Sequence, residues 1–289
     1  MASAYSTVNR EQTNHPREFA DFAYVYPVIS RRSGGVSIGV NLNPDKLCNF
    51  DCPYCQVDRT IAKPKLAIKP EAIRAELEAL LGQVDGSGVC RLDRFASIPD
   101  EAKHLKDISV SGDGEPTMAP EFPEVCVMLA SLQASRPDVK LVLITNSTLL
   151  DRKETLAGIG HLLSRNGEVW AKLDAGTEAW FQKINVSRTS LDRIEANLIR
   201  LGRDFPFAIQ SLFCALDGVS PPEPELEAYL ARLTRIKESG SRISEVQLYT
   251  LARKPAQAFC TPVSREFLED LAHRIESIGL RATVYGIQA

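Results

Sequence analysis

The chain has 289 residues, of which 44% are hydrophobic and 25% charged, and its formal net charge is −3. This composition is ordinary for a soluble globular protein. A chain with this slightly negative net charge does not attract a polyanion as a whole, which argues against tight nucleic-acid binding. The sequence holds no run of 18 or more apolar residues, which excludes a membrane-spanning helix.

The cysteines and the first residues indicate the compartment. Seven cysteines, odd in number and mostly single, do not form the pattern of a secreted disulfide framework. Residues 1–17 are polar and lack the apolar core of a signal peptide. We therefore expect a cytoplasmic protein, with a polar N-terminal arm at residues 1–20 and a single domain at residues 21–289.

Hydrophobic periodicity predicts alternating strands and helices along the chain. Strands are predicted at residues 22–29, 36–42, 107–111, 139–145, 168–174, 207–213, 246–251 and 281–285. Helices are predicted at residues 70–83, 120–134, 151–163, 177–183, 190–201, 221–237 and 264–278. Residues 84–104 lack a clear period and are interpreted as an insertion that contains Cys90. Such alternation implies a parallel sheet with right-handed crossovers. The predicted fold class is α/β, a partial (β/α)6 TIM-like barrel with extra N- and C-terminal strands.

Three cysteines directly follow the strand predicted at residues 36–42. Cys48, Cys52 and Cys55 have C-x3-C-x2-C spacing, so their sulfurs can converge from one tight loop. Thiolates bind soft metals and hold iron–sulfur clusters. A four-iron cluster with three cysteine ligands leaves one iron open to a small molecule that carries an amine and a carboxylate. The alternative is a structural zinc site, which needs four nitrogen or sulfur ligands. No second cysteine pair exists to complete one, and the four histidines are scattered.

The cysteine spacing, with Tyr54 immediately before the third cysteine, resembles the radical S-adenosylmethionine (SAM) superfamily. The resemblance implies that Cys48, Cys52 and Cys55 ligate a [4Fe–4S] cluster whose open iron binds the methionine end of SAM. It implies an enzyme that reductively cleaves SAM to a 5′-deoxyadenosyl radical, which then abstracts a hydrogen atom from a substrate. It also implies an electron donor of the flavodoxin or ferredoxin kind.

A glycine-containing loop follows the strand predicted at residues 107–111. Gly112, Asp113, Gly114 and Glu115 resemble the Gly-Gly-Glu motif of the same superfamily, with Asp113 as a departure. Glycines allow a backbone to approach a ligand closely. The resemblance implies that this segment holds the SAM ammonium group, and the two acidic side chains suit such a partner on Coulomb grounds.

Polar residues stand at the ends of other predicted strands. The carboxyl ends of parallel strands meet at one mouth of a barrel, which here would gather Asn146, Asp174, Gln210 and Leu251. The family resemblance implies that Asn146, Asp174 and Gln210 contact the SAM ribose and carboxylate. By the same resemblance, Tyr54 and Leu251 are adenine contacts. A purely structural role is the alternative for each of them.

A closer resemblance extends over residues 36–255. Within this range, residues 36–42, 48–56, 172–175 and 246–253 are similar to the branch of the superfamily that contains the tRNA wybutosine-synthesis enzymes. Those enzymes use a second cluster bound by upstream cysteines and a lysine that attacks pyruvate. Here no cysteine precedes Cys48 and no lysine precedes Lys46. We therefore carry over the fold and the SAM site of the branch and leave the substrate open.

Alternative functions and residue roles stay open at this level. One alternative is a non-catalytic iron–sulfur or zinc protein that binds a partner through the basic segment at residues 56–69; another is a tRNA-modifying radical SAM enzyme. Cys214 and Cys260 could be auxiliary ligands, a thiyl relay or ordinary buried cysteines. Arg253 and Lys254 could bind a carboxylate or phosphate, or form salt bridges with neighbouring acids.

Overall fold

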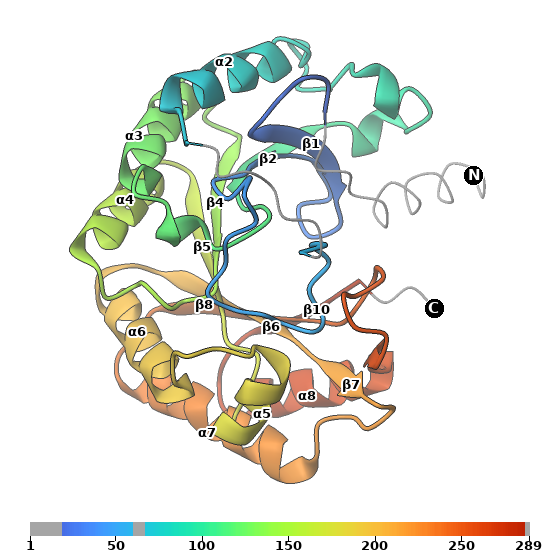
Figure 1. The fold of residues 1–289 in the computed structure, drawn as a ribbon, viewed down its shortest axis with the longest axis vertical. Coiled ribbons are helices and arrows are strands. Elements are labelled where there is room, and N and C mark those ends of the chain that lie inside the picture. Colours follow the sequence, from blue (N-terminus) through green and yellow to red (C-terminus); the bar gives the residue numbers. More distant parts are fainter. Residues whose placement is uncertain (1–18, 60–66, 287–289) are drawn as a thin grey trace. The chain divides into compact units, whose positions relative to one another are not determined.

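The structure, a computed structural model, describes residues 19–59 and 67–286, which fall into two compact units (Figure 1). Unit 1 comprises Met1–Leu47, Lys63–Leu143 and Gly158–Gly167, and unit 2 comprises Cys48–Ala62, Ile144–Ala157 and Glu168–Ala289. Most of the predicted arm at residues 1–20, and residues 60–66 of the predicted basic segment, lie outside the described residues.

Unit 1 contains a sheet with the order β1-β2-β3-β4. The strands are β1 (Val25–Ser30), β2 (Gly35–Val40), β3 (Leu105–Val110) and β4 (Lys140–Thr145), whose last two residues belong to unit 2. β1 pairs antiparallel with β2, whereas β2, β3 and β4 pair in parallel. The predicted additional edge strand is therefore present as β1, one to three residues later in the sequence than predicted.

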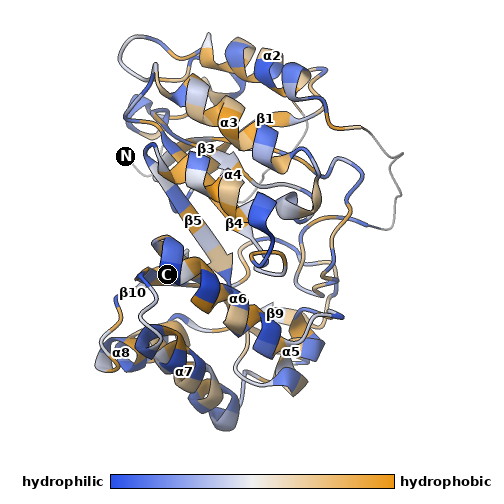
Figure 2. Cartoon of the chain, turned by 90° about the vertical axis from the view of Figure 1, so that its left-hand side faces the viewer, coloured by the Kyte–Doolittle hydropathy of each residue, from blue (hydrophilic) through white to orange (hydrophobic). Residues whose placement is uncertain are grey.

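The helices of unit 1 lie within two residues of their predicted bounds. They are α2 (Pro70–Leu81), α3 (Phe122–Gln133) and α4 (Lys153–Leu163), which begins in unit 2. In α2 the apolar residues Ile73, Leu77, Leu80 and Leu81, which recur at helical spacing, are buried, and Figure 2 shows hydrophilic residues elsewhere on this helix. The predicted insertion contains two short 3-10 helices, η1 (Asp93–Phe95) and η2 (Asp100–Ala102), and a third, η3 (Pro116–Met118), follows β3.

Unit 2 contains parallel strands in the order β5-β6-β8-β10. These are β5 (Gly167–Lys172), β6 (Phe207–Leu212), β8 (Ile243–Tyr249) and β10 (Ala282–Tyr285). β6 is buried along its whole length, including its polar residues Gln210 and Ser211. β5 ends at Lys172, so Asp174 lies in the loop just after the strand rather than within it.

Three of the helices of unit 2 begin just after a residue whose side chain caps them. The helices of this unit are α5 (Glu178–Ile184), α6 (Leu191–Asp204), α7 (Glu223–Glu238) and α8 (Arg265–Ser277). The hydroxyls of Thr177, Ser190 and Ser264 each accept a hydrogen bond from a backbone N–H of the first turn. Gly240, at a φ of +82° after α7, closes that helix in the left-handed conformation that glycine adopts without strain.

A small antiparallel ribbon was not predicted. It consists of β7 (Cys214–Leu216) and β9 (Cys260–Pro262), which pair across 43 residues of intervening sequence. Asp217 and Gly218, both at positive φ, form the turn after β7. Each strand has three residues, which is too short for the alternation that identifies a strand in sequence.

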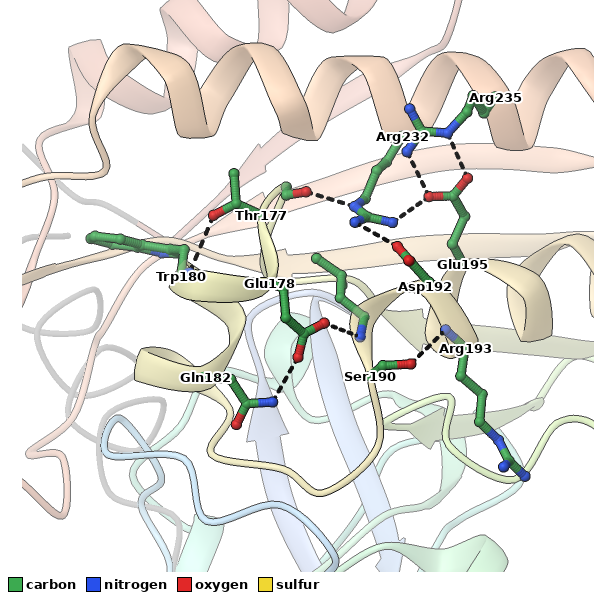
Figure 3. A network of polar contacts seen from close by, with 12 residues as sticks. Thr177, Glu178, Trp180, Gln182, Ser190, Asp192, Arg193, Glu195, Arg232 and Arg235 are labelled. Atoms are coloured by element: carbon green, nitrogen blue, oxygen red, sulfur yellow. Dashed lines mark hydrogen bonds and ion pairs between the residues drawn. The ribbon is translucent and has the colours of Figure 1, made fainter.

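A polar network on α6 and α7 fixes the loop that carries Asp174 (Figure 3). Arg232 on α7 bonds Glu195 at 2.5 Å and Asp192 at 2.9 Å, and its Nε donates to the carbonyl of Gly176 at 2.6 Å. Arg235 also donates to Glu195, at 2.7 Å. Because Gly176 lies two residues after Asp174, this network restrains the backbone on which the Asp174 carboxylate is mounted.

Candidate functional site

The cysteine loop, residues 48–55, is held by backbone hydrogen bonds from two other segments of unit 2. The amide of Asp51 donates to the carbonyl of Asn185 at 3.0 Å, and the amide of Ala256 donates to the carbonyl of Cys55 at 2.7 Å. Phe50 stacks edge-on against Phe181 of α5, with ring centroids 5.5 Å apart. The loop that follows α5 and the loop that follows β8 thus set the conformation of the cysteine loop.

The three cysteines of the loop form no disulfide bond and are of intermediate exposure. Nη1 of Arg59 lies 3.1 Å from the sulfur of Cys55. Burial alone would lower the pKa of Arg59, but its attraction to the sulfurs of Cys55, Cys48 and Cys52 outweighs burial and raises it. All three sulfurs therefore lie within electrostatic range of one guanidinium group.

The cysteines fit an iron–sulfur cluster in the kind of ligand they offer, because three soft thiols come from a single loop. Across residues 19–59 and 67–286, no group of three or more histidine, cysteine, aspartate or glutamate side chains is placed to hold a single metal ion. A [4Fe–4S] cluster is bound differently, because each cysteine ligates a different iron.

The sulfur of Cys52 contacts both the backbone and the side chain of Asn185. The thiol lies 3.8 Å from the carbonyl oxygen of Asn185, and the side-chain amide of the same residue donates toward the sulfur at 3.6 Å. Burial raises the pKa of the Cys52 thiol to about 12. A cysteine must lose its proton to bind a metal, so groups that donate hydrogen bonds to this sulfur favour its ligand form.

A buried polar network, here called the Asp174 network, lies beside Cys52. The phenol of Tyr54 donates to Oδ2 of Asp174 at 2.5 Å, and the side-chain amide of Asn185 donates to the same oxygen at 2.9 Å and to the Tyr54 oxygen at 3.0 Å. Nζ of Lys172 lies 3.1 Å from Oδ1 of Asp174 and donates to the phenol of Tyr249 at 2.9 Å. These contacts join the cysteine loop to β5, β8 and the loop after α5.

The charged side chains of this network are almost fully buried. The side chain of Lys172 is 14% exposed and that of Asp174 1% exposed. Burial alone would lower the pKa of Lys172, but attraction to Asp174 and the contact with Tyr249 outweigh it and raise the pKa. Burial also raises the pKa of Tyr54. Lys172 is therefore a cation at neutral pH, and its charge is balanced by Asp174.

Asn146 and Gln210, the other predicted polar strand-end residues, lie in different surroundings within unit 2. The amide of Asn146 donates to the side chain of Asn49 at 2.6 Å and lies 4.0 Å from the sulfur of Cys48, so it contacts the cysteine loop directly. Gln210, on β6, contacts Gln247 at 3.3 Å and the phenol of Tyr249 at 3.4 Å. The structure thus brings Asn146 to the cysteine loop and Gln210 to the edge of the Asp174 network.

The predicted glycine loop belongs to unit 1, where it packs on the segment after β2. The backbone and side chain of Asp113 bond to the side chain of Asn41 at 3.2 and 2.9 Å. A Cβ at Gly112 would collide with Asn41, and one at Gly114 would collide with the carbonyl of Leu47. Both glycines are therefore required by close packing within this unit. The side chain of Glu115 accepts hydrogen bonds from the amide and hydroxyl of Thr117.

The remaining candidates lie on or near β7, β8 and β9. Leu251 is buried just after β8. Cys214 and Cys260 are buried on the β7–β9 ribbon, where their thiols interact with one another, and burial raises the pKa of both. Arg253 is half-buried and Lys254 is exposed.

Three residues that were not predicted as site residues belong to the Asp174 network. Lys172 and Tyr249 lie in sequence segments that resemble the family. They are 77 positions apart, and nothing in the sequence indicated that they contact each other. Asn185 follows α5 in a segment with no motif. It contacts Cys52 across 133 positions of sequence, a distance over which residue spacing carries no signal.

The fold and this site define the class of protein. The sequence model of the Radical SAM superfamily matches residues 42–203, and the chain belongs to that superfamily. The chain is accordingly a radical SAM enzyme, of a family whose members use a [4Fe–4S] cluster and SAM. The fold class predicted from the sequence is confirmed.

Particular relatives are similar over most of the chain. A UPF0026 protein of Methanocaldococcus jannaschii is 33% identical over 84% of this chain and 67% of its own length. A UPF0026 protein of Helicobacter pylori is 24% identical over 78% of this chain and 65% of its own length. The solved structure of TYW1 with a lysine-pyruvate adduct bound has a TM-score of 0.56 at 14% identity, covering 93% of this chain and 80% of that one. At this identity the TYW1 likeness shows the fold alone.

Within residues 19–59 and 67–286, no helix combines the length and the apolar character needed to cross a bilayer.

Proposed function

We propose that Cys48, Cys52 and Cys55 hold the [4Fe–4S] cluster of this enzyme and that the open iron binds SAM. When bound, the cluster and SAM supply a 5′-deoxyadenosyl radical that abstracts a hydrogen atom from a substrate still to be identified. The observation that carries this proposal is the attachment of the cysteine loop to a buried polar network through Cys52, Tyr54 and Asn185. Fixed ligands and a dry surrounding are what a protein contributes to cofactor chemistry.

The predicted SAM contacts are part of the proposal. Asn146 and Gln210 are proposed to bind the ribose and carboxylate, and both present side-chain amides, which suit either group. Asp174 is proposed with them, although its two oxygens already accept from Tyr54, Asn185 and the amide of Leu212 and face Lys172. A ribose hydroxyl at Asp174 would therefore share an oxygen with one of these groups.

The other members of the proposed set hold the two ends of SAM. Residues 112–115 are proposed to bind the ammonium group, through the backbone and the two acidic side chains. Tyr54 and Leu251 are proposed as adenine contacts. Since the phenol of Tyr54 is bonded to Asp174, only the face of its ring would remain for the base.

The test is anaerobic reconstitution with iron and sulfide, followed by dithionite and SAM. The expected result is a full cluster in the unaltered protein, with 5′-deoxyadenosine and methionine as products. Cys52→Ala should lose iron, whereas Cys126→Ala, which alters a buried cysteine of α3 in unit 1, should keep it. Full iron retention in Cys52→Ala, or one tightly bound zinc in place of iron in the unaltered protein, would contradict the proposal.

We propose a reducing cytosol as the compartment and a flavodoxin-like or ferredoxin-like protein as the electron donor. For RNA substrates the net charge of −3 predicts weak, salt-sensitive binding. Titration of labelled tRNA at two salt concentrations measures this. Tight binding that persists at high salt would favour a tRNA-modifying enzyme instead.

A further inference from the structure

Asn185 occupies a central position beside the cysteine loop that none of the family signals indicated. It is the residue that ends α5, and its backbone amide donates to the carbonyl of Phe181 at 2.8 Å. Its side chain is completely buried. The helix end and this hydrogen bond fix the backbone of Asn185. Its side-chain amide is buried in unit 2.

The side-chain amide nitrogen of Asn185 serves three acceptors. It lies 3.6 Å from the sulfur of Cys52, 3.0 Å from the phenol oxygen of Tyr54 and 2.9 Å from Oδ2 of Asp174. An N–H to sulfur bond is longer than an N–H to oxygen bond, so the Cys52 contact is a reasonable hydrogen bond. One amide group therefore connects a cysteine sulfur to the Asp174 network.

The orientation of this amide is determined by its neighbours. If the oxygen and nitrogen exchanged places, the oxygen would face the carboxylate of Asp174, and two acceptors would oppose each other. With the nitrogen directed at Asp174, Oδ1 of Asn185 is buried and has no hydrogen-bond partner among the described residues. Buried acceptors without partners are rare, because each one costs free energy. The Asn185 side chain therefore leaves one buried oxygen without a hydrogen bond, while its N–H groups point at Cys52, Tyr54 and Asp174.

The next residue carries backbone strain. Val186 has a φ of +45°, a conformation that β-branched residues seldom adopt, and 45% of its surface is exposed. The carbonyl oxygens of Asn185 and Val186 both accept from the amide of Asp51 in the cysteine loop, at 3.0 and 3.3 Å. Strain of this kind concentrates at functional sites, where the surrounding structure imposes a precise position.

We infer that Asn185 is a positioning residue that donates an N–H hydrogen bond to the sulfur of Cys52 and thereby raises the reduction potential of the cluster bound there. This inference rests on the proposed function, since it takes Cys52 as a cluster ligand. Reduction adds negative charge to a cluster and its thiolates, and a hydrogen bond to a ligand sulfur stabilises that charge. The hydrogen bond from Asn185 therefore favours reduction of the cluster, and this effect needs no contact between Asn185 and the substrate.

The test compares two asparagines of unit 2 that are both buried. Asn185→Leu removes the donor and keeps the number and branching of the side-chain heavy atoms. Asn197→Leu is the matched control, because Asn197 on α6 donates to the carbonyls of Ser147 and Thr148 at 2.8 and 3.0 Å. The measurement is an EPR-monitored redox titration of each reconstituted protein without SAM, together with iron content.

The expected result is a midpoint potential that is more negative in Asn185→Leu, by about 59 mV for a tenfold loss in the one-electron reduction equilibrium. Asn197→Leu should keep the potential of the unaltered protein. If Asn185→Leu fails to fold, as shown by its far-UV circular dichroism, Asn185→Ser replaces it, because the shorter hydroxyl cannot reach the sulfur.

An unchanged potential in a folded, iron-loaded Asn185 variant would overturn the inference, and so would an equal shift in Asn197→Leu. Failure of the proposed function is distinguishable from this outcome. In that case Cys52→Ala would retain its iron, and there would be no Cys52-ligated cluster whose potential could shift.

Discussion

The carboxylate of Asp174 and the ammonium of Lys172 form a buried ion pair 3.1 Å apart, with side-chain exposures of 1% and 14%. Asp174→Asn removes the negative charge while keeping nearly the same shape. The cation then remains buried with the phenol of Tyr249 but without its counter-charge. We therefore expect a large loss of stability from a change of one atom.

The magnitude follows from the distance. At an effective dielectric constant of about 20, two unit charges 3.1 Å apart attract by about 5 kcal/mol. Breaking a buried pair by removing one partner typically costs about 3–5 kcal/mol. We expect Asp174→Asn to lower the free energy of unfolding by about 3–4 kcal/mol, because the 14% exposure of Lys172 allows some hydration of its charge.

The assay is urea-induced unfolding of the metal-free protein at pH 7 under anaerobic conditions, followed by far-UV circular dichroism. The double variant Asp174→Asn with Lys172→Met removes both charges and should recover about 2 kcal/mol relative to the sum of the single changes. A loss below about 1 kcal/mol in Asp174→Asn, or full additivity of the two changes, would refute the reasoning, because either would mean that the charges do not depend on each other.

Three further predictions concern other parts of the two units. Burial alone would raise the pKa of Glu195, but hydrogen bonds from Arg235 and Arg232 outweigh it and lower the pKa below its ordinary 4.5. The stability that Glu195 contributes is thus present above pH 4.5 and lost as the pH falls below it, so Glu195→Gln should cost about 2 kcal/mol at pH 7 and progressively less below pH 4.5 in denaturation at each pH. Gly114→Ala places a methyl group against the carbonyl of Leu47 and should lower the melting temperature, with a loss of about 1–3 kcal/mol, whereas Gly86→Ala, with open space around its Cβ, should be nearly neutral. Tyr229→Phe removes a hydroxyl that lies 2.6 Å from Ser211 Oγ and should cost about 1 kcal/mol in urea unfolding; no measurable loss would mean that the two hydroxyls are not bonded.

The sequence by itself determined the elements and the ligand loop. The period of apolar residues located the helices and strands to within a few residues, because burial of one face is a local requirement. The apolar residues of α2 are buried for that reason, and Thr177, Ser190 and Ser264 cap their helices through contacts that also join residues close in sequence. Cys48, Cys52 and Cys55 lie within eight residues, so their common loop was also readable from spacing.

Only the tertiary structure decided which distant residues meet around that loop. Asn185 contacts Cys52 across 133 positions and Lys172 contacts Tyr249 across 77. The β7–β9 ribbon brings Cys214 and Cys260 together although neither strand is long enough to show alternation. Such contacts depend on where parallel strands pair and where a helix ends in space, and those positions are set by the packing of the whole unit, which no local pattern in the sequence encodes.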